Sequence, residues 1–406
     1  MMGFWQYLKW SSIYILSIVI GSALLTAVWR DWTAVLNFNF LVWDAEVLYR
    51  IVKDGYDYYT VAFYPMFPWL WKVLSAAPWL MSLLNGALFL VVASLIGASQ
   101  KMTRTAFLLH LSWPSILFMV LPYSEALLFV LTFCFLHFRG KASWILAGFF
   151  LFLMSLTKPT AAIMLPALCI AEWLATDTSW SYVRRILYFA AMIIAGNFLV
   201  WYVQFLQTGE WFIFFRAQSE IWQQSLSFPT LPLATWDSNN VIWLDAAALY
   251  FTLLAVAFSL LIIRDHILQG SRFDITWLYA VVAMAGTGMF VLCFRQGMLF
   301  SLNRFVFASA FFLYLSPRGV IRSELFRALS SIGLHIAIAV VVSLLCGGYQ
   351  HIRLLMAFAV LSIFLVYYVR HSWFMHFHWG AYVLLVLIWC FAVFYGQRIL
   401  AGQWVA

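Results

Sequence analysis

The chain has 406 residues, of which 65% are hydrophobic, 20% aromatic and only 9% charged. A soluble globule of this length needs far more charged surface, so the composition excludes a soluble protein. Apolar runs near the roughly 20 residues that cross a bilayer as a helix recur along the whole chain, and the period-two alternation of a barrel is absent. The predicted fold class is therefore an all-α polytopic membrane protein.

The apolar runs predict about thirteen transmembrane helices in one integral-membrane domain that covers residues 1–406. These runs cover residues 10–29, 78–98, 104–121, 123–138, 143–157, 159–175, 186–207, 245–263, 275–294, 298–315, 328–346, 352–369 and 379–396. The first run follows only Lys9 and lacks a small-residue cleavage site, so we expect a retained span instead of a cleaved signal peptide. Two long loops, 30–78 and 208–240, interrupt the series.

The distribution of Lys and Arg predicts the orientation. The short connections are richer in these residues on one side, and the positive-inside rule makes that side cytoplasmic, together with the N-terminus. Both long loops then lie on the extracytoplasmic face. The net charge of +8 follows from this topology more than from any partner, so membrane lipids are expected partners and nucleic acid is not.

The segment VWDAEVLYRIVKDGY, residues 42–56, is unusually charged for this chain. Its apolar residues recur at helical spacing opposite the charged ones, and Gly55 supplies a C-terminal stop, which predicts a short amphipathic helix in the membrane interface. Asp44 stands at or near the start of this helix. It is either a helix cap or a carboxylate that loses part of its hydration at the boundary and becomes a stronger base.

The next segment, VAFYPMFPWLWKVL, carries Pro65 and Pro68 among aromatic residues that include Tyr64. The prolines end one helix and begin another along the membrane surface. Two interfacial helices that are joined by an aromatic turn and preceded by an acidic residue predict a site for a lipid-borne substrate, with Tyr64 as one contact.

These two segments resemble the signature of the PIG-V family, the dolichol-phosphate-mannose-dependent mannosyltransferases of GPI-anchor assembly and their prokaryotic relatives. In that family a Trp-Asp pair, a helix that ends in Gly-Tyr and a turn with two prolines come in this order. Further segments that fit the pattern are LPYSEALLFVLTFCFLHFRGK, FFLMSLTKPTAAIMLPAL, EWFIFFRAQSEIWQQSLSFP and LNRFVFASAFFLYL. The likeness runs in collinear order from about residue 38 to residue 315.

The resemblance implies a GT-C-type bundle, a polyprenyl-phosphate sugar donor and a catalytic Asp, which maps to Asp44. The chain departs from the family pattern at two places. After Trp222 this chain has Gln223 and Gln224, where relatives often have Gly-Arg. Lys158 replaces the Arg of the common Thr-Arg-Pro motif. A basic residue near the phosphate is therefore expected to come from elsewhere in the chain.

The chemistry can also be argued from the residues. A sugar on a lipid phosphate already has a good leaving group, so transfer needs one base for the acceptor hydroxyl and cations for the departing phosphate. We expect Asp44 to be the base, with inversion at the anomeric carbon. Glu46 points to another side of the helix and is interpreted as a solvated or ion-paired residue near the substrate. The Asp-x-Glu spacing could hold a divalent cation, but no other acidic cluster supports one, so no cofactor is expected.

The candidates for phosphate binding are basic residues on the predicted outer side. They are Arg295, Arg304, Lys158 and Arg216. Arg304 lies inside a predicted span, where a charge is costly and tends to be functional or paired. Arg295 could instead snorkel at a helix end, and Lys158 could be an interfacial anchor. Arg216 is the weakest candidate.

Three other groups of residues are interpreted as structural. Glu125 follows LPYS and is explained as a first-turn carboxylate of a helix that is capped by Ser124. The segment HSWFMHFHWG contains His371, His376 and His378. These histidines could suggest a metal, but interfacial His among aromatic residues is the preferred interpretation. The five cysteines show no metal spacing and are expected to pack in apolar runs.

Two functions remain open at this point. The first is the inverting glycosyltransferase, which moves a hexose, mannose by family, to a lipid, glycan or protein acceptor. The second is a transporter or lipid flippase without chemistry, which the concentration of charge in an outer loop argues against. We expect a prokaryotic plasma membrane, with the endoplasmic reticulum membrane as the alternative. The sequence does not indicate the oligomeric state.

Overall fold

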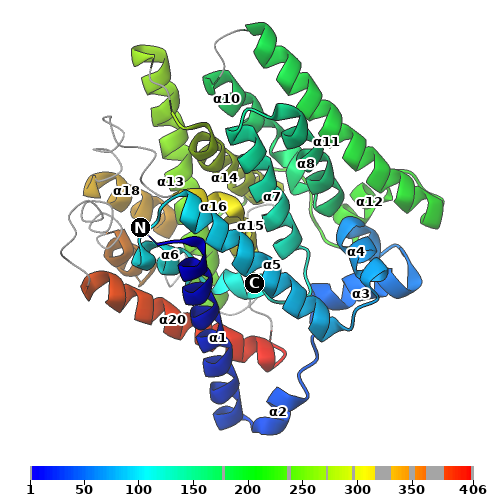
Figure 1. Ribbon diagram of the computed structural model, residues 1–406, viewed down its shortest axis with the longest axis vertical. Helices are drawn as coiled ribbons and strands as arrows, with labels where there is room; N and C mark the ends of the chain where they lie inside the picture. The colour runs from blue at the N-terminus through cyan, green and yellow to red at the C-terminus, as the bar shows by residue number, and fades with distance from the viewer. Residues whose placement is uncertain are drawn as a thin grey trace.

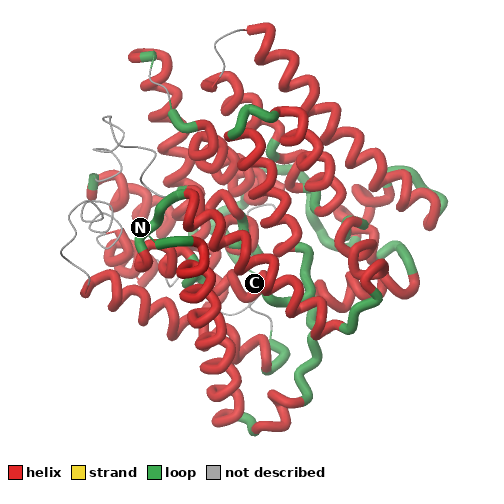
Figure 2. The backbone as a smooth tube through the Cα atoms, viewed as in Figure 1, coloured by secondary structure: helices red, strands yellow, loops and turns green. Residues whose placement is uncertain are grey.

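The computed structural model describes residues 2–175, 179–235, 239–270, 273–294, 298–315, 331–346, 353–362 and 379–403. Every regular element in these ranges is helical (Figure 2). Ala234 and Met298 pair in an isolated parallel β-bridge. The predicted all-α class is confirmed.

The helices follow one another through short connections. Up to the second long loop they are α1 (Phe4–Trp29), α2 (Trp32–Leu36), α3 (Asp44–Asp54), η1 (Thr60–Ala62), α4 (Met66–Leu74), α5 (Pro78–Ser99), α6 (Arg104–His110), η2 (Pro114–Met119), α7 (Glu125–Gly140), α8 (Trp144–Thr157), α9 (Thr160–Ile163), α10 (Leu165–Ala175) and α11 (Ser179–Thr208). Beyond it they are α12 (Ile213–Glu220), α13 (Asn239–Gln269), α14 (Ile275–Phe294), α15 (Leu302–Phe307), α16 (Ala310–Tyr314), α18 (Ile332–Leu345), the helix Arg353–Ser362 and α20 (Trp379–Leu400).

Six helices in the described ranges are long and apolar enough to cross a membrane, and they lie in α1, α5, α11, α13, α14 and α20. Helices α13 and α14 form the centre, because 67% and 72% of their most apolar stretches are buried. Helices α1, α11 and α20 lie at the periphery (Figure 1), and only 28–33% of their most apolar stretches is buried. Exposed apolar side chains on these helices include Leu16, Ile194 and Val386. An outward-facing apolar surface of this extent is suited to lipid, so the protein is an all-α membrane protein.

Three predicted spans are not continuous helices. The run 104–121 contains α6 and η2, because Pro114 removes a backbone donor after Trp113 and restarts the chain as a 3-10 helix. The run 298–315 contains the short helices α15 and α16. A third run, 159–175, is interrupted between α9 and α10. Hydropathy alone did not reveal these breaks, because the broken segments are buried by protein and remain apolar.

The first long loop folds into α2, α3, η1 and α4, and hydrogen bonds attach it to α11. Helix α3 ends at Gly55, whose φ of +83° is the left-handed conformation that glycine adopts at no steric cost. A Cβ there would approach the Oε1 atom of Gln207 to 2.8 Å. That same oxygen accepts the backbone N–H of Tyr56 at 2.6 Å, and the Nε2 atom of Gln204 donates to the carbonyl of Val61 at 2.8 Å. The loop is therefore fixed to one side of α11.

A buried ion cluster ties four helices together at the end of α7 that lies farther from this loop. The guanidinium of Arg139 binds the carboxylate of Glu172 from α10, with an Nη2–Oε2 distance of 3.0 Å. Arg185 of α11 and Tyr279 of α14 also donate to Glu172. Because Glu172 is fully buried, these donors supply the hydrogen bonds that water would otherwise make.

Candidate active site

A cavity of about 1030 Å³ opens between the first long loop and helices from the rest of the chain. The side chains that line it include Asp44 of α3, Phe63 and Tyr64 of the aromatic turn, Lys158 and Thr160 beside α9, Ile194 and Asn197 of α11, Gln218, Trp222 and Gln224 of the second loop, Phe290 and Phe294 of α14, and Ser301 and Arg304 of α15. We call the charged lining residues Asp44, Lys158 and Arg304 the polar wall, and the apolar lining residues Ile163, Ile193, Ile194, Phe290 and Phe294 the apolar wall. A cavity with both kinds of lining could bind an amphipathic molecule.

Four charged side chains meet at the polar wall. An Nη2 atom of Arg304 lies 2.7 Å from the Oδ2 atom of Asp44 and also contacts Glu125, whose Oε1 atom accepts from Nε of Arg304 at 2.9 Å. The ammonium of Lys158 lies 2.7 Å from the same Oε1 atom. Two carboxylates and two cations thus form one connected network, which satisfies charges that would be costly to bury singly.

Asp44 is the most accessible member of this cluster. Its side chain is 24% exposed, whereas those of Arg304 and Glu125 are 8% and 3% exposed. Asp44 is the first residue of α3 and follows Trp43, whose φ is 48°. The Tyr123 hydroxyl donates to the Val42 carbonyl at 3.1 Å and so holds the chain just before Asp44.

Arg304 is positioned by a buried network of neutral and acidic groups. Asn303, the preceding residue, donates from its backbone and its side chain to Asp245 of α13 at 3.0 and 2.6 Å. The guanidinium of Arg304 also lies over the rings of Phe118 and Tyr123, at 4.7 and 5.0 Å. Cation–π contacts of this kind orient a planar guanidinium without neutralising it.

The predicted cap by Ser124 is wrong, although Glu125 does lie in the first turn of α7 as predicted. Ser124 makes no side-chain capping bond, and the Glu125 carboxylate instead holds both Arg304 and Lys158. The first-turn position is a sufficient local explanation of Glu125, so the sequence carries no signal of its long-range partners. Lys158 likewise lies in the cluster and lines the cavity, so the structure does not place it at the surface as a simple anchor.

Because of Lys158, phosphate binding is expected to weaken as pH rises into the alkaline range. Burial lowers the pKa of its ammonium, with Arg304 adding to the effect and the carboxylates of Glu125 and Asp44 opposing it. A lysine binds phosphate only while protonated, so binding of a polyprenyl phosphate should weaken as pH rises, at a lower pH than for an exposed lysine. Titration of that affinity against pH checks this. The variant K158R should move the loss to higher pH, and coincident profiles would contradict the prediction.

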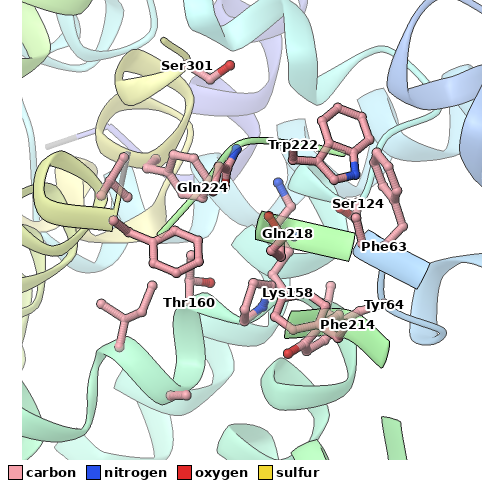
Figure 3. A pocket seen from close by; sticks show the side chains of 18 of the residues that line it. Phe63, Tyr64, Ser124, Lys158, Thr160, Phe214, Gln218, Trp222, Gln224 and Ser301 are labelled. Carbon is pink, nitrogen blue, oxygen red and sulfur yellow. The ribbon is translucent and has the colours of Figure 1, made fainter. Parts of the chain in front are cut away.

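Tyr64 lines the cavity, but its hydroxyl is directed elsewhere. It donates to Oδ1 of Asn197 on α11 at 3.0 Å, and its ring packs edge-on against Phe214 at 5.5 Å (Figure 3). Replacement of Tyr64 by Phe should lower the free energy of unfolding by about 1 kcal/mol, since the Oδ1 atom of buried Asn197 loses this donor. Affinity for a polyprenyl phosphate should stay unchanged. A melting curve in detergent and the same binding titration test both statements.

The second long loop covers the cavity with aromatic and amide side chains. Trp222 packs on Tyr59 at 5.2 Å and on Phe63 at 5.9 Å, and Gln218 lines the same cavity (Figure 3). Burial, followed by the nearby Asp44 carboxylate, raises the pKa of Tyr59, so this ring is expected to stay a neutral phenol at physiological pH. The aromatic rim therefore stands next to the proposed base.

Several buried polar atoms of the lining lack a partner in the described part of the chain. They are Thr160 Oγ1, Gln218 Oε1, Ser301 Oγ, Trp201 Nε1 and Trp222 Nε1. Buried polar groups are nearly always hydrogen-bonded in folded proteins. Such unsatisfied atoms around one cavity favour a ligand that is rich in hydroxyl groups. Sequence reasoning did not single out Thr160, Gln218 or Ser301, because small polar residues carry no spacing signal.

The apolar wall runs toward the periphery of the bundle. It includes Phe290 and Phe294 of α14 together with Ile163 and Ile193, and its member Ile194 on α11 is 62% exposed. The cavity thus connects the ion cluster with a surface suited to lipid. A chain of isoprene units could follow this wall while a polar head group reaches Asp44.

The remaining predicted residues lie in different places. Glu46 lines the cavity, is exposed and forms no salt bridge within the described ranges. Arg216 pairs with Glu210 at 2.7 Å, about half exposed, and does not line the cavity. Arg295 and the histidines of HSWFMHFHWG lie outside the described residues. Within those residues no group of three His, Cys, Asp or Glu side chains is arranged to hold a metal ion.

No family model, curated protein or solved structure matches the chain. Fold and site define a class all the same: an all-α membrane protein with a partly buried ion cluster in a cavity that reaches an outward-facing apolar surface.

Proposed function

We propose that the protein is an inverting glycosyltransferase of the GT-C type and a member of the PIG-V family. It transfers a hexose, mannose by the family resemblance, from a polyprenyl (dolichyl-type) phosphate to a hydroxyl of a lipid, glycan or protein acceptor. The observation that carries this proposal is the meeting of Asp44 with Arg304, from 260 residues apart, at the polar wall of a cavity with an apolar exit.

In the proposed step, the Asp44 carboxylate takes the proton of the acceptor hydroxyl. The hydroxyl oxygen attacks the anomeric carbon from the face opposite the phosphate, and the bond between that carbon and the phosphate oxygen breaks, with its electron pair leaving on the phosphate. One base on one face gives inversion. Arg304 and Lys158 stabilise the charge that gathers on the departing phosphate. Because that phosphate is already a good leaving group, the step needs no general acid.

Asp44 is held by Arg304 before the substrate binds. A phosphate that enters the cavity competes for this guanidinium, because it offers more acceptor oxygens in a geometry that arginine binds well. Binding of the donor would therefore release Asp44 for its role as base. The unsatisfied atoms of Thr160, Gln218 and Ser301 would accept or donate hydrogen bonds to sugar hydroxyls.

The proposed location is the extracytoplasmic side of a prokaryotic plasma membrane, in a bundle of about thirteen spans. The experiment is transfer of radiolabel from polyprenyl-phosphate mannose to endogenous acceptors in membranes that contain the chain, compared with membranes that lack it. A labelled product that depends on the chain supports the proposal. Counterflow of labelled lipid in proteoliposomes without a covalent product would instead identify a transporter.

A further inference from the structure

We propose that Glu125 is a positioning residue that sets the net charge of the phosphate-binding site and so allows the phosphate product to leave. Glu125 does not line the cavity; its carboxylate lies behind the two cations that do. This inference rests on the proposed function for the identity of the phosphate, but the contacts themselves are independent of it.

The geometry gives Glu125 control of both cations. Its Oε1 atom accepts from Nε and Nη2 of Arg304 and from Nζ of Lys158. The bond from Nε to Glu125 fixes the plane of the guanidinium. The Nη1 atom of Arg304 has no hydrogen-bond partner in the described part of the chain, so this atom stays available to a further acceptor. Glu125 is only 3% exposed, so solvent screens these charges weakly.

The charge balance explains why a carboxylate is needed at this position. With Glu125 and Asp44 ionised, the cluster is neutral and must accept a phosphodiester with one negative charge. After transfer, the proton resides on Asp44 and the phosphate monoester gains charge. Without Glu125, the two cations would face Asp44 alone, and they would hold both the phosphate and the Asp44 carboxylate more tightly. The product would leave slowly.

The test uses the purified full chain in detergent and a sugar-free polyprenyl phosphate as the probe. E125Q keeps the shape of the side chain and removes its charge. We expect this variant to bind the probe at least about tenfold more tightly than the wild type. The pH at which binding is lost should also fall, because Lys158 loses the carboxylate that favours its charged form, while Arg304 still opposes that form and only Asp44 remains to support it.

In the transfer assay, E125Q should show a lower kcat together with a lower KM for the donor. A residue that only supports the fold would lower activity without tightening binding. E210Q is the matched control, because Glu210 pairs with an exposed arginine outside the cavity and its removal should leave affinity and pH profile unchanged. Equal or weaker probe binding by E125Q, with the wild-type pH profile, would overturn the inference.

A second variant covers the case in which E125Q does not fold. E125D keeps the charge but withdraws it by one methylene from both cations, so it should shift affinity and pH profile in the same direction by a smaller amount. If E125D then showed the affinity and the pH profile of the wild type, the proposed role of Glu125 would be rejected. If the wild type transfers no sugar at all, the proposed function fails, yet the binding comparison still decides the role of Glu125.

Discussion

Replacement of Asp44 by Asn should lower the rate of sugar transfer by at least about a hundredfold, the usual contribution of a general base. Asn keeps the size of the side chain and a hydrogen-bond acceptor for Arg304, but it cannot take a proton from the acceptor hydroxyl. The fold should survive, because Glu125 still pairs with Arg304. Initial rates with radiolabelled polyprenyl-phosphate mannose, at matched protein levels, measure the loss.

The control for this variant is Asp54→Asn on the same helix. Asp54 is the last residue of α3, is exposed and does not line the cavity. The Asp54→Asn variant should transfer sugar at the wild-type rate. A wild-type rate for the Asp44 variant as well would reject Asp44 as the base and direct attention to Glu46, the other carboxylate in the cavity lining.

Replacement of Arg304 by Met should remove both activity and much of the stability. Met fills a similar volume but leaves Asp44 without its cation and Glu125 with Lys158 alone. Removing one partner from a buried pair costs about 3–5 kcal/mol, because the remaining charge stays buried without compensation. We expect a clear drop in the melting temperature in detergent and no detectable transfer.

Two comparisons make the Arg304 result interpretable. Arg304→Lys keeps the charge but not the planar fork that reaches two carboxylates at once, so it should retain most of the stability and lose much of the activity. Arg216→Met removes an arginine from an exposed pair and should change stability by less than about 1 kcal/mol. A melting temperature for Arg304→Met equal to that of the wild type would show that the cluster does not stabilise the fold.

The helical class, the long spans and the amphipathic helix after Trp43 could be predicted because each depends on local composition and period. The breaks at Pro114 and between α15 and α16 could not, because a buried broken segment is as apolar as a continuous span. The polar residues of α11 that hold the first loop, Gln204 and Gln207, gave no signal either. Their partners are backbone groups, which no sequence pattern identifies.

The candidate site shows the same limit. Asp44, Arg304 and Lys158 were each singled out as a residue type in an unusual place, and the structure brings the three together. Their connection through Glu125 was missed, because a carboxylate in the first turn of a helix has a sufficient local explanation. Whether these residues act on a sugar phosphate stays a prediction until transfer is measured.

The two ion clusters at opposite ends of α7 fix the position of this helix. Helix α7 has 16 residues, so its axis is about 24 Å long. Glu125 at one end and Arg139 at the other are both paired with other segments of the chain, so sliding α7 along its axis would break buried ion pairs at both ends. The length of α7 therefore sets the distance between the cluster that contains Asp44 and the cluster that contains Glu172.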